Sequence, residues 1–250
     1  MNNSFFQSEE AASRYKRFRP KTHEAIIAMV KPHLPGKMFK SALDIACGTG
    51  DSSGSLKQIA EEVVGVDRSE AMLKYAKKQC HETHCLDIGD LPSLNRKFQF
   101  LSVCMAFHWF DPAIAIPAMK AVSQDDGYWL IYNFAYGGHA TNKDLNRWYQ
   151  DDYKRRFPPP SRGSTSGREL LKNDPELKLV FHHEGKLPVR MSPSELVGYL
   201  TTQSNVDHQI RGGKDYESVE KNLIAKVESF DPTDSFLYSY RLDLYRFSAK

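Results

Sequence analysis

The sequence predicts an α/β fold built on a doubly wound, mostly parallel sheet. Short apolar segments alternate with helical segments over residues 36–134, and such alternation is typical of parallel strands joined by crossover helices. The stretch "FQFLSVCMAF" (98–107) is apolar throughout, which indicates a strand buried on both faces of the sheet. The chain has 250 residues, of which 40% are hydrophobic and 12% aromatic, so it can bury a full core.

The first half contains five predicted strands with helices between them. Ser69 is the expected N-cap of the helix "EAMLKYAKKQC" (70–80), and Asp111 followed by Pro112 opens another helix. A further helix covers "DSSGSLKQIA" (51–60). The predicted strands are "SALDIA" (41–46), "EEVVGVD" (61–67), "THCLDI" (83–88), "FQFLSVCMAF" (98–107) and "GYWLIYNF" (127–134).

The alternation breaks after residue 134. Residues 135–176 are polar and rich in turn residues around one helical stretch at 143–157, so we expect an inserted cap. After the cap, Ser192 and Glu195 form a capping box for a helix over 194–203. The remaining predicted elements are a strand at 177–187, a helix at 215–229 and a final strand at 235–247.

Composition disfavours several classes of protein. The net charge of +3 permits an anionic substrate but is no sign of nucleic-acid binding. No apolar run approaches the roughly 20 residues that span a membrane, and residues 1–20 lack the apolar core of a secretory leader. We therefore expect a cytoplasmic protein with no membrane partner. Its four cysteines, Cys47, Cys80, Cys85 and Cys104, are expected to be reduced.

A glycine turn follows the first predicted strand in "SALDIACGTGDSSG" (41–54). Gly54 comes four residues after Gly50, whereas a dinucleotide-binding turn requires three. Asp44, near the end of the strand, would repel a phosphate but suits a cationic amino group. Asp67 ends the next strand, where an acid can accept hydrogen bonds from both hydroxyls of a ribose. A ligand with a ribose, an amine and no diphosphate is implied, and S-adenosylmethionine fits.

Several motifs together resemble a known family. "LDIACGTG" (43–50) and "VVGVDRSEAML" (63–73) resemble the first two motifs of class I S-adenosylmethionine-dependent methyltransferases. "LDIGDLP" (86–92) resembles the segment of that family that contacts adenine. "AFHWFD" (106–111) and "YKRFRPKTHEAI" (15–26) resemble signatures of the subgroup that includes trans-aconitate methyltransferase-like enzymes. "GYLTTQS" (198–204) and the closing aromatic strand resemble later elements of that subgroup, so the resemblance covers nearly the whole chain.

The resemblance implies a Rossmann-like sheet of seven strands, mostly parallel with an antiparallel last strand. One methyltransferase domain would span 1–250, with N-terminal lid helices (1–35), a cofactor-binding half (36–134), the cap (135–176) and a C-terminal sheet half (177–250). The cofactor would be S-adenosyl-L-methionine and the product S-adenosyl-L-homocysteine. Asp87 would lie near the exocyclic amine of adenine and Ile88 against its ring. The implied cofactor-binding residues are Tyr15, Arg19, Asp44, Ala46, Gly48, Gly50, Asp67, Arg68, Met72, Asp87, Ile88, Cys104 and Phe107.

Four positions depart from the family pattern. Ala46 replaces the first glycine, and Gln99 and Gly89 stand where acids are common. Gln203 stands where a tryptophan is usual. The last difference concerns the acceptor pocket, so it bears on the substrate rather than on the cofactor.

His108 is the candidate catalytic residue. Methyl transfer is an in-line displacement that requires the nucleophile about 3–3.5 Å from the methyl carbon, and a base is needed only when the acceptor carries a proton. His108 follows the fourth strand, at the edge where such sheets bind ligands. Three roles are open for His108. It acts as a general base, it orients the substrate or contacts the cofactor, or it merely packs beside Trp109.

Arginines supply the candidate anion-binding groups. A carboxylate acceptor is already ionised at neutral pH, so it needs a clamp instead of a base. Arg14, with His108 and Trp109, is the predicted substrate-binding set; Arg14, Arg17 and Arg19 alternatively form a solvated helix face. In the cap, the arginines that extend an anion site would be Arg155, Arg156 and Arg162.

No metal site is predicted. Cys80, His81, His84 and Cys85 cluster in sequence, but Cys80 ends a helix while His84 and Cys85 enter a strand, where successive side chains point to opposite faces. The neighbouring histidines at 182 and 183 alternate faces in the same way.

The leading prediction is a methyltransferase acting on a small-molecule acceptor, with carboxylate O-methylation favoured only by the subgroup resemblance. O- or N-methylation of a hydroxyl or an amine of a small metabolite is the near alternative. A nucleic-acid methyltransferase is disfavoured by the small net charge and the absence of a recognisable RNA-binding appendage. A catalytically inert S-adenosylmethionine-binding protein remains open, because a fold does not prove turnover. We expect a monomer or a homodimer.

Overall fold

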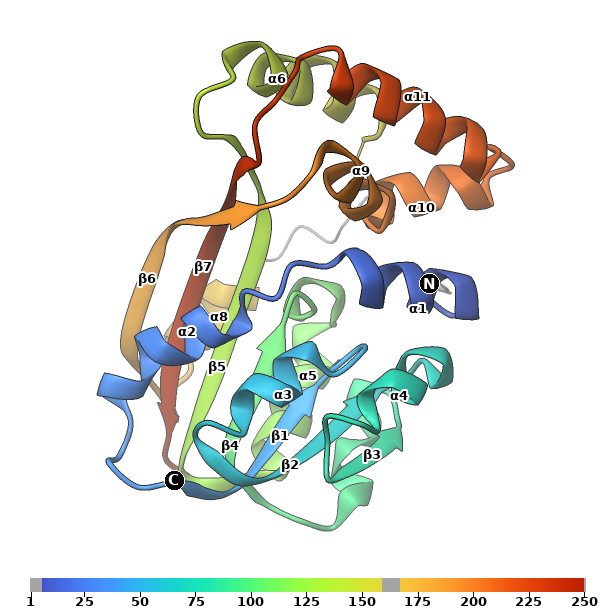
Figure 1. Cartoon of the computed structure of the whole chain (residues 1–250). Coiled ribbons are helices and arrows are strands. Elements are labelled where there is room, and N and C mark those ends of the chain that lie inside the picture. The colour runs from blue at the N-terminus through green and yellow to red at the C-terminus, as the bar shows by residue number, and fades with distance from the viewer. Residues whose placement is uncertain (1–5, 159–166, 250) are drawn as a thin grey trace. The chain divides into compact units, whose positions relative to one another are not determined.

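A computed structural model describes residues 6–158 and 167–249, and within it the chain forms two compact units. The larger unit comprises residues 21–133, 162–184 and 241–250, and the smaller comprises 1–20, 134–161 and 185–240. Seven strands form one mixed sheet in the order β3-β2-β1-β4-β5-β7-β6, with β7 running against its neighbours (Figure 1). The predicted seven-stranded Rossmann-like sheet with an antiparallel last strand is confirmed.

The larger unit is built on parallel strands whose ends meet at one edge. Ile45 of β1 pairs with Val66 of β2 and with Val103 of β4, and Asp67 pairs with Cys85 of β3. Their carboxyl ends therefore carry the loops of the candidate site side by side. The strands are β1 (Phe39–Ile45), β2 (Ala60–Asp67), β3 (Glu82–Cys85), β4 (Phe98–Cys104) and the first part of β5 (Ser123–His139).

The core of this unit is the β1–β4 sheet with its covering helices. Six of the seven residues of β4 are buried, which confirms the predicted burial of that strand on both faces. The helices are α2 (His23–Val30), η1 (Lys31–His33), α3 (Asp51–Leu56), α4 (Glu70–Ala76), η2 (Ile88–Leu94), η3 (Phe107–Trp109), α5 (Pro112–Ala121) and α8 (Gly167–Asn173).

The predicted helix caps are confirmed. The Ser69 hydroxyl accepts a hydrogen bond from the Met72 backbone N–H, and the Asp111 carboxylate accepts one from the N–H of Ala113. These bonds satisfy N–H groups that a helix start leaves without an intrahelical partner.

Some predicted boundaries are wrong by a few residues. The helix predicted over 51–60 ends at Leu56, because β2 already begins at Ala60. The third strand ends at Cys85 rather than at residue 88, because Asp87 caps η2. The fifth strand is much longer than 127–134 and runs over Ser123–His139, with a register irregularity opposite Phe98 and Phe100.

The smaller unit combines helices with the distal parts of the long strands. The predicted Ser192–Glu195 capping box is confirmed. The helix predicted over 143–157 contains a π-helical turn, η4, in its middle. The elements are α1 (Glu9–Phe18), α6 (Lys143–Trp148), η4 (Tyr149–Tyr153), α7 (Lys154–Arg156), α9 (Pro193–Thr201), α10 (Ser204–Arg211) and α11 (Tyr216–Glu228), with parts of β6 (Leu177–Arg190) and β7 (Ser235–Phe247).

The division of one domain into lid, cofactor half, cap and C-terminal half stays a prediction. Of the helices in the described ranges, none combines the length and the apolar character needed to cross a bilayer.

Candidate functional site

The loop after β1 has a tight, left-handed backbone. Ala46, Gly48 and Gly50 have φ values of 55°, 54° and 81°. Two features exclude a side chain at Gly50. Its φ value is positive, and a Cβ there would lie 2.8 Å from the Ala76 Cα of α4. At Gly48, by contrast, no described atom beyond the glycine and its two chain neighbours lies within 4 Å of the place a Cβ would take. The loop therefore presents its backbone to open space at Gly48.

Asp67 fixes this loop to the end of β2. Its Oδ2 accepts a 2.9 Å hydrogen bond from the Gly48 N–H, and its Oδ1 accepts a 2.8 Å bond from the Ser69 N–H. Burial raises the pKa of Asp67, although the two backbone bonds oppose that shift. An ionised carboxylate has about four acceptor positions, so capacity remains for further donors.

Asp44 is fully buried under the same loop. Its Oδ2 accepts hydrogen bonds from the Ser52 and Ser53 hydroxyls of α3, both at 2.6 Å. Its Oδ1 is buried and has no hydrogen-bond partner among the described residues. Burial raises the pKa of Asp44 to about 6, against the effect of the serine hydroxyls. The carboxylate thus holds the start of α3 and keeps one oxygen for an additional donor.

The ends of β3 and β4 carry the remaining predicted residues of this unit. Asp87 is exposed and its Oδ1 accepts a 2.7 Å bond from the N–H of Ile88, whose side chain is buried in the core. Cys104 and Phe107 are buried. Arg68 lies exposed after Asp67, and Met72 is buried on α4.

His108 lies in η3, just beyond β4, with an exposed side chain. Its ring centroid is 5.0 Å from that of the partly buried Trp109. The predicted position at the ligand edge of the sheet is therefore occupied by an accessible imidazole. Its role as a base stays a prediction.

Sequence reasoning missed a histidine in the larger unit. His23 Nδ1 lies 2.9 Å from the Tyr132 hydroxyl and 3.8 Å from Cys104 Sγ. Burial raises the pKa of Tyr132 well above its usual value. His23 and Tyr132 are 109 positions apart, and only the polar residues inside the otherwise apolar stretch "GYWLIYNF" could have signalled the contact.

The N-terminal candidates belong to the smaller unit. The Arg19 guanidinium lies over the rings of Tyr15 and Tyr199, at 4.5 and 5.1 Å from their centroids, and donates a 2.9 Å hydrogen bond to the Thr202 carbonyl. The Arg14 guanidinium lies 4.4 Å from the ring centroid of Tyr216. Such stacking holds a guanidinium plane in a fixed orientation.

Arg17 differs from its two neighbours on the same segment. It is exposed and lies over the ring of Phe18, which follows it in the chain. The interpretation as a solvated helix face therefore fits Arg17, but not the partly buried Arg14 and Arg19.

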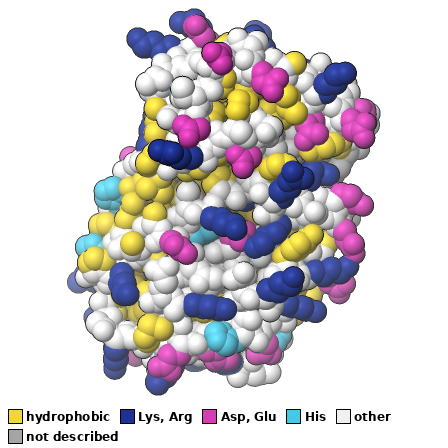
Figure 2. Space-filling view, viewed as in Figure 1, with side chains coloured by type: hydrophobic (Ala, Val, Ile, Leu, Met, Phe, Trp, Pro, Cys, Tyr) yellow, Lys and Arg dark blue, Asp and Glu magenta, His cyan; other side chains and the backbone are white. Residues whose placement is uncertain are grey.

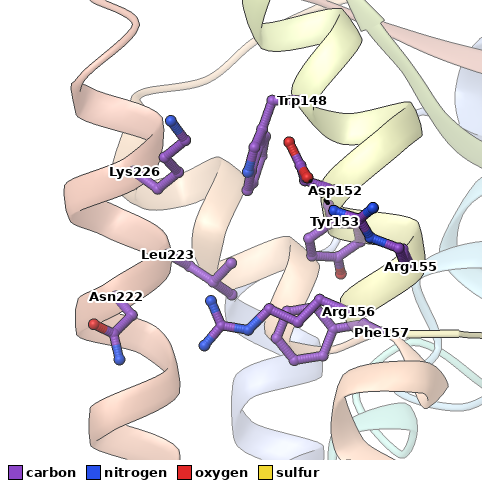
Figure 3. A pocket seen from close by; sticks show the side chains of 9 residues that line it. All are labelled: Trp148, Asp152, Tyr153, Arg155, Arg156, Phe157, Asn222, Leu223 and Lys226. Atoms are coloured by element: carbon purple, nitrogen blue, oxygen red, sulfur yellow. Dashed lines mark hydrogen bonds and ion pairs between the residues drawn. The ribbon is translucent and has the colours of Figure 1, made fainter.

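The smaller unit also contains a pocket of about 290 Å³ between α11 and the segment that runs from α6 to residue 157 (Figure 3). Arg155 lines the pocket and forms a 2.7 Å ion pair with Asp152, and Arg156 lies over the ring of Phe157. Arg162, the third arginine predicted for an anion site, lies outside the described residues. The pocket is lined by Trp148, Asp152, Tyr153, Arg155, Arg156, Phe157, Asn222, Leu223 and Lys226.

The residues considered for zinc have other contacts. His81 Nδ1 accepts a 3.0 Å hydrogen bond from the Val63 N–H, and His84 pairs with Glu82. Cys80 is buried, whereas Cys85 is exposed, and both are free thiols. Over residues 6–158 and 167–249, no three His, Cys, Asp or Glu side chains gather in a way that could hold a metal ion.

Comparison with known proteins identifies the fold and the type of domain. Residues 42–127 match a family model described as a methyltransferase domain. A protein of Dictyostelium discoideum named as a methyltransferase is 23% identical over 94% of this chain and 91% of its own length. An uncharacterized methyltransferase of Mycobacterium tuberculosis is 26% identical over 79% of this chain and 72% of its own length.

Solved structures agree with that fold. A methyltransferase structure from Anaeromyxobacter dehalogenans is 19% identical and superposes with a TM-score of 0.68, covering 92% of this chain and 98% of that one. A second, from Bacillus halodurans, has a TM-score of 0.55 at 19% identity, over 90% of this chain and 99% of that one.

Proposed function

We propose that the chain is a class I S-adenosylmethionine-dependent methyltransferase that methylates a carboxylate of a small-molecule acceptor, a proposal supported by the matched methyltransferase domain and the seven-stranded sheet. The family implies S-adenosylmethionine as the methyl donor. When bound, that cofactor supplies a methyl carbon activated by a sulfonium. The protein has to hold the donor, align the acceptor and keep water out.

Asp67 is the observation on which the proposed cofactor site depends. Both of its oxygens are oriented by backbone N–H groups, and its remaining acceptor positions suit the two ribose hydroxyls. The loop backbone at Ala46, Gly48 and Gly50 then lies beside the ligand, and the open space at Gly48 leaves room for it.

The methionine and adenine ends of the cofactor have candidate partners in the same unit. The buried Oδ1 of Asp44 has no partner in the described part of the chain, and we propose it as the acceptor for an ammonium donor. Asp87 would accept from the adenine amine, with Ile88 against the ring. Arg68, Met72, Cys104 and Phe107 are proposed as the surrounding contacts. Tyr15 and Arg19 remain proposed cofactor contacts.

A carboxylate acceptor needs orientation rather than deprotonation. Arg14 provides a guanidinium group whose plane is held by the ring of Tyr216, and a guanidinium can bind a carboxylate through two parallel hydrogen bonds. A malonyl-[acyl-carrier protein] O-methyltransferase from Hamiltonella defensa is 33% identical over 42% of both chains, which is compatible with methylation at oxygen.

The distribution of charge supports a small acceptor. On the face shown in Figure 2, Lys and Arg side chains are interspersed with Asp and Glu. Three basic residues line the pocket of the smaller unit: Arg155, Arg156 and Lys226. They are proposed as an additional anion-binding region, and all three belong to that unit.

A hydroxyl acceptor is the second candidate, because His108 is exposed beyond β4. A hydroxyl keeps its proton at neutral pH, so its methylation requires a base such as an imidazole. Trp109 would then pack against the acceptor.

The test is an acceptor screen with mass spectrometry. Purified protein is incubated with S-adenosylmethionine and separate pools of carboxylic acids, hydroxyl compounds and amines. A methyl ester together with stoichiometric S-adenosylhomocysteine is expected in the first pool. Methylation only in another pool would refute the carboxylate assignment. Binding of the cofactor without turnover in any pool would instead identify an inert binder.

A further inference from the structure

Two buried cysteines meet beneath the loop that follows β1. Cys47 lies in that loop, and Cys80 follows the last turn of α4. Their side chains are 5% and 9% exposed, and they pack with Leu73 and Ala76 in a small cluster of their own.

Gly65 on β2 reveals how close the two sulfurs lie. A Cβ built on Gly65 would lie 2.7 Å from Cys80 Sγ and 2.9 Å from Cys47 Sγ, so both sulfurs crowd around one point. The Cys47 thiol also donates a 3.9 Å hydrogen bond to the Gly48 carbonyl oxygen. A glycine at position 65 therefore leaves the space that the thiol pair fills.

The nearness of the two thiols shifts their pKa values in opposite directions. The neighbouring Cys80 thiol raises the pKa of Cys47 well above its usual value, and burial adds to that shift. The neighbouring Cys47 thiol lowers the pKa of Cys80. Because the thiolate is the nucleophile, Cys80 is the more reactive member of the pair.

We propose that Cys47 and Cys80 form an oxidisable pair whose disulfide loosens the loop at the cofactor site. The oxidant is hydrogen peroxide. The Cys80 thiolate attacks one peroxide oxygen, the O–O bond breaks, and the other oxygen leaves as water after taking up a proton. The Cys47 sulfur then attacks the resulting Cys80 sulfenic acid, an S–S bond forms, and the second oxygen leaves as water with the Cys47 proton. The two thiols lose two electrons, which the peroxide gains.

The disulfide would change the geometry of the loop. An S–S bond is about 2.05 Å long, shorter than the separation of two unbonded sulfurs, so we expect its formation to draw Cys47 and its loop toward Cys80. Cys47 donates a 3.0 Å hydrogen bond to the Val66 carbonyl and precedes Gly48, whose N–H binds Asp67. Movement at Cys47 therefore disturbs the anchor of the proposed ribose site. This consequence rests on the proposed function.

The experiment uses the Cys85→Ser protein, because Cys85 is an exposed thiol that would react separately. After treatment with hydrogen peroxide, peptide mass spectrometry should find Cys47 and Cys80 cross-linked with the loss of two hydrogens, and dithiothreitol should restore both thiols. Calorimetry with S-adenosylhomocysteine should show at least a tenfold rise in Kd on oxidation and recovery on reduction. The double variant Cys85→Ser/Cys80→Ser should bind equally well before and after peroxide.

Three results separate the ideas. If peroxide oxidises Cys85 in the unmodified protein while Cys47 and Cys80 stay free thiols, the proposal that these two cysteines form a disulfide is refuted. A cross-link with unchanged Kd would overturn its effect on the loop. If the reduced protein fails to bind S-adenosylhomocysteine, the proposed cofactor site and the effect on binding are both refuted, whereas the cross-link is still decided by peptide mass alone.

Discussion

Replacement of Asp44 by Asn should change how the stability of the protein depends on pH. Asp44 is fully buried, and its pKa is raised from the ordinary 3.8 to about 6. One pKa unit corresponds to about 1.36 kcal/mol, so this shift amounts to about 3 kcal/mol. The variant has nearly the same shape but no ionisable group at this position.

The sign follows from proton binding in the folded and unfolded states. Between pH 3.8 and 6 the folded protein keeps the proton on Asp44 while the unfolded chain loses it. Stability from this group is therefore fully present below pH 3.8 and is lost as the pH rises through about 6. Relative to Asp44→Asn, the wild-type protein should lose up to about 3 kcal/mol between pH 4 and pH 7.5.

Urea unfolding of both proteins at a series of pH values measures this difference. The change with pH is the test, because the amide group adds a pH-independent cost next to the unpartnered oxygen position. Asp90→Asn, at an exposed aspartate, is the matched control. A constant difference between wild type and Asp44→Asn over this range would refute the assignment of a buried, raised-pKa carboxylate.

Three further substitutions test the proposed binding roles. Asp67→Ala should weaken S-adenosylhomocysteine binding by about 1–3 kcal/mol in calorimetry, because a charged hydrogen-bonding partner is lost. The control Glu61→Gln, on the same strand, should leave Kd unchanged. Equal affinities of Asp67→Ala and wild type would exclude the role of Asp67 in ribose binding. Arg14→Lys should raise KM for a carboxylate acceptor about tenfold through loss of the planar fork, with the exposed Arg17→Lys as control. An unaltered KM would exclude Arg14 from acceptor binding. His108→Ala should lower kcat about 10²-fold for a hydroxyl acceptor and leave kcat for a carboxylate acceptor nearly unchanged. If the variant and the wild type have equal rates with both acceptors, His108 has only a structural role.

The features that the sequence predicts well depend on neighbouring residues. The Ser69 cap acts on an N–H three residues away, and the Ser192–Glu195 box spans the same distance. The strand β4 is predicted from its unbroken apolar run. In each case the physical cause lies within one short window of sequence, so no knowledge of the tertiary structure is required.

The contacts of the candidate site depend on packing between distant segments. Asp44 is readily identified as an acid beside a glycine turn, but nothing local indicates that Ser52 and Ser53 turn their hydroxyls toward it. The pairing of His23 with Tyr132 joins an N-terminal helix to the fifth strand. Such contacts arise only when the sheet order brings the segments together, so the sequence identifies the candidate residues without their partners.

Burial of the Asp44 and Asp67 carboxylates under the loop costs stability, and a cationic ligand would give that cost a purpose. Asp44 and Asp67 are both desolvated, and the charge of Asp67 further raises the pKa of Asp44. A bound ammonium or sulfonium would favour the ionised form of both acids, so binding below about pH 6 should release protons and affinity should rise with pH. The stability lost by burying Asp44 would then be offset when the cation binds. A fold that needed only to hold α3 could do so with an amide at position 44, which accepts the same two serine bonds without a buried charge.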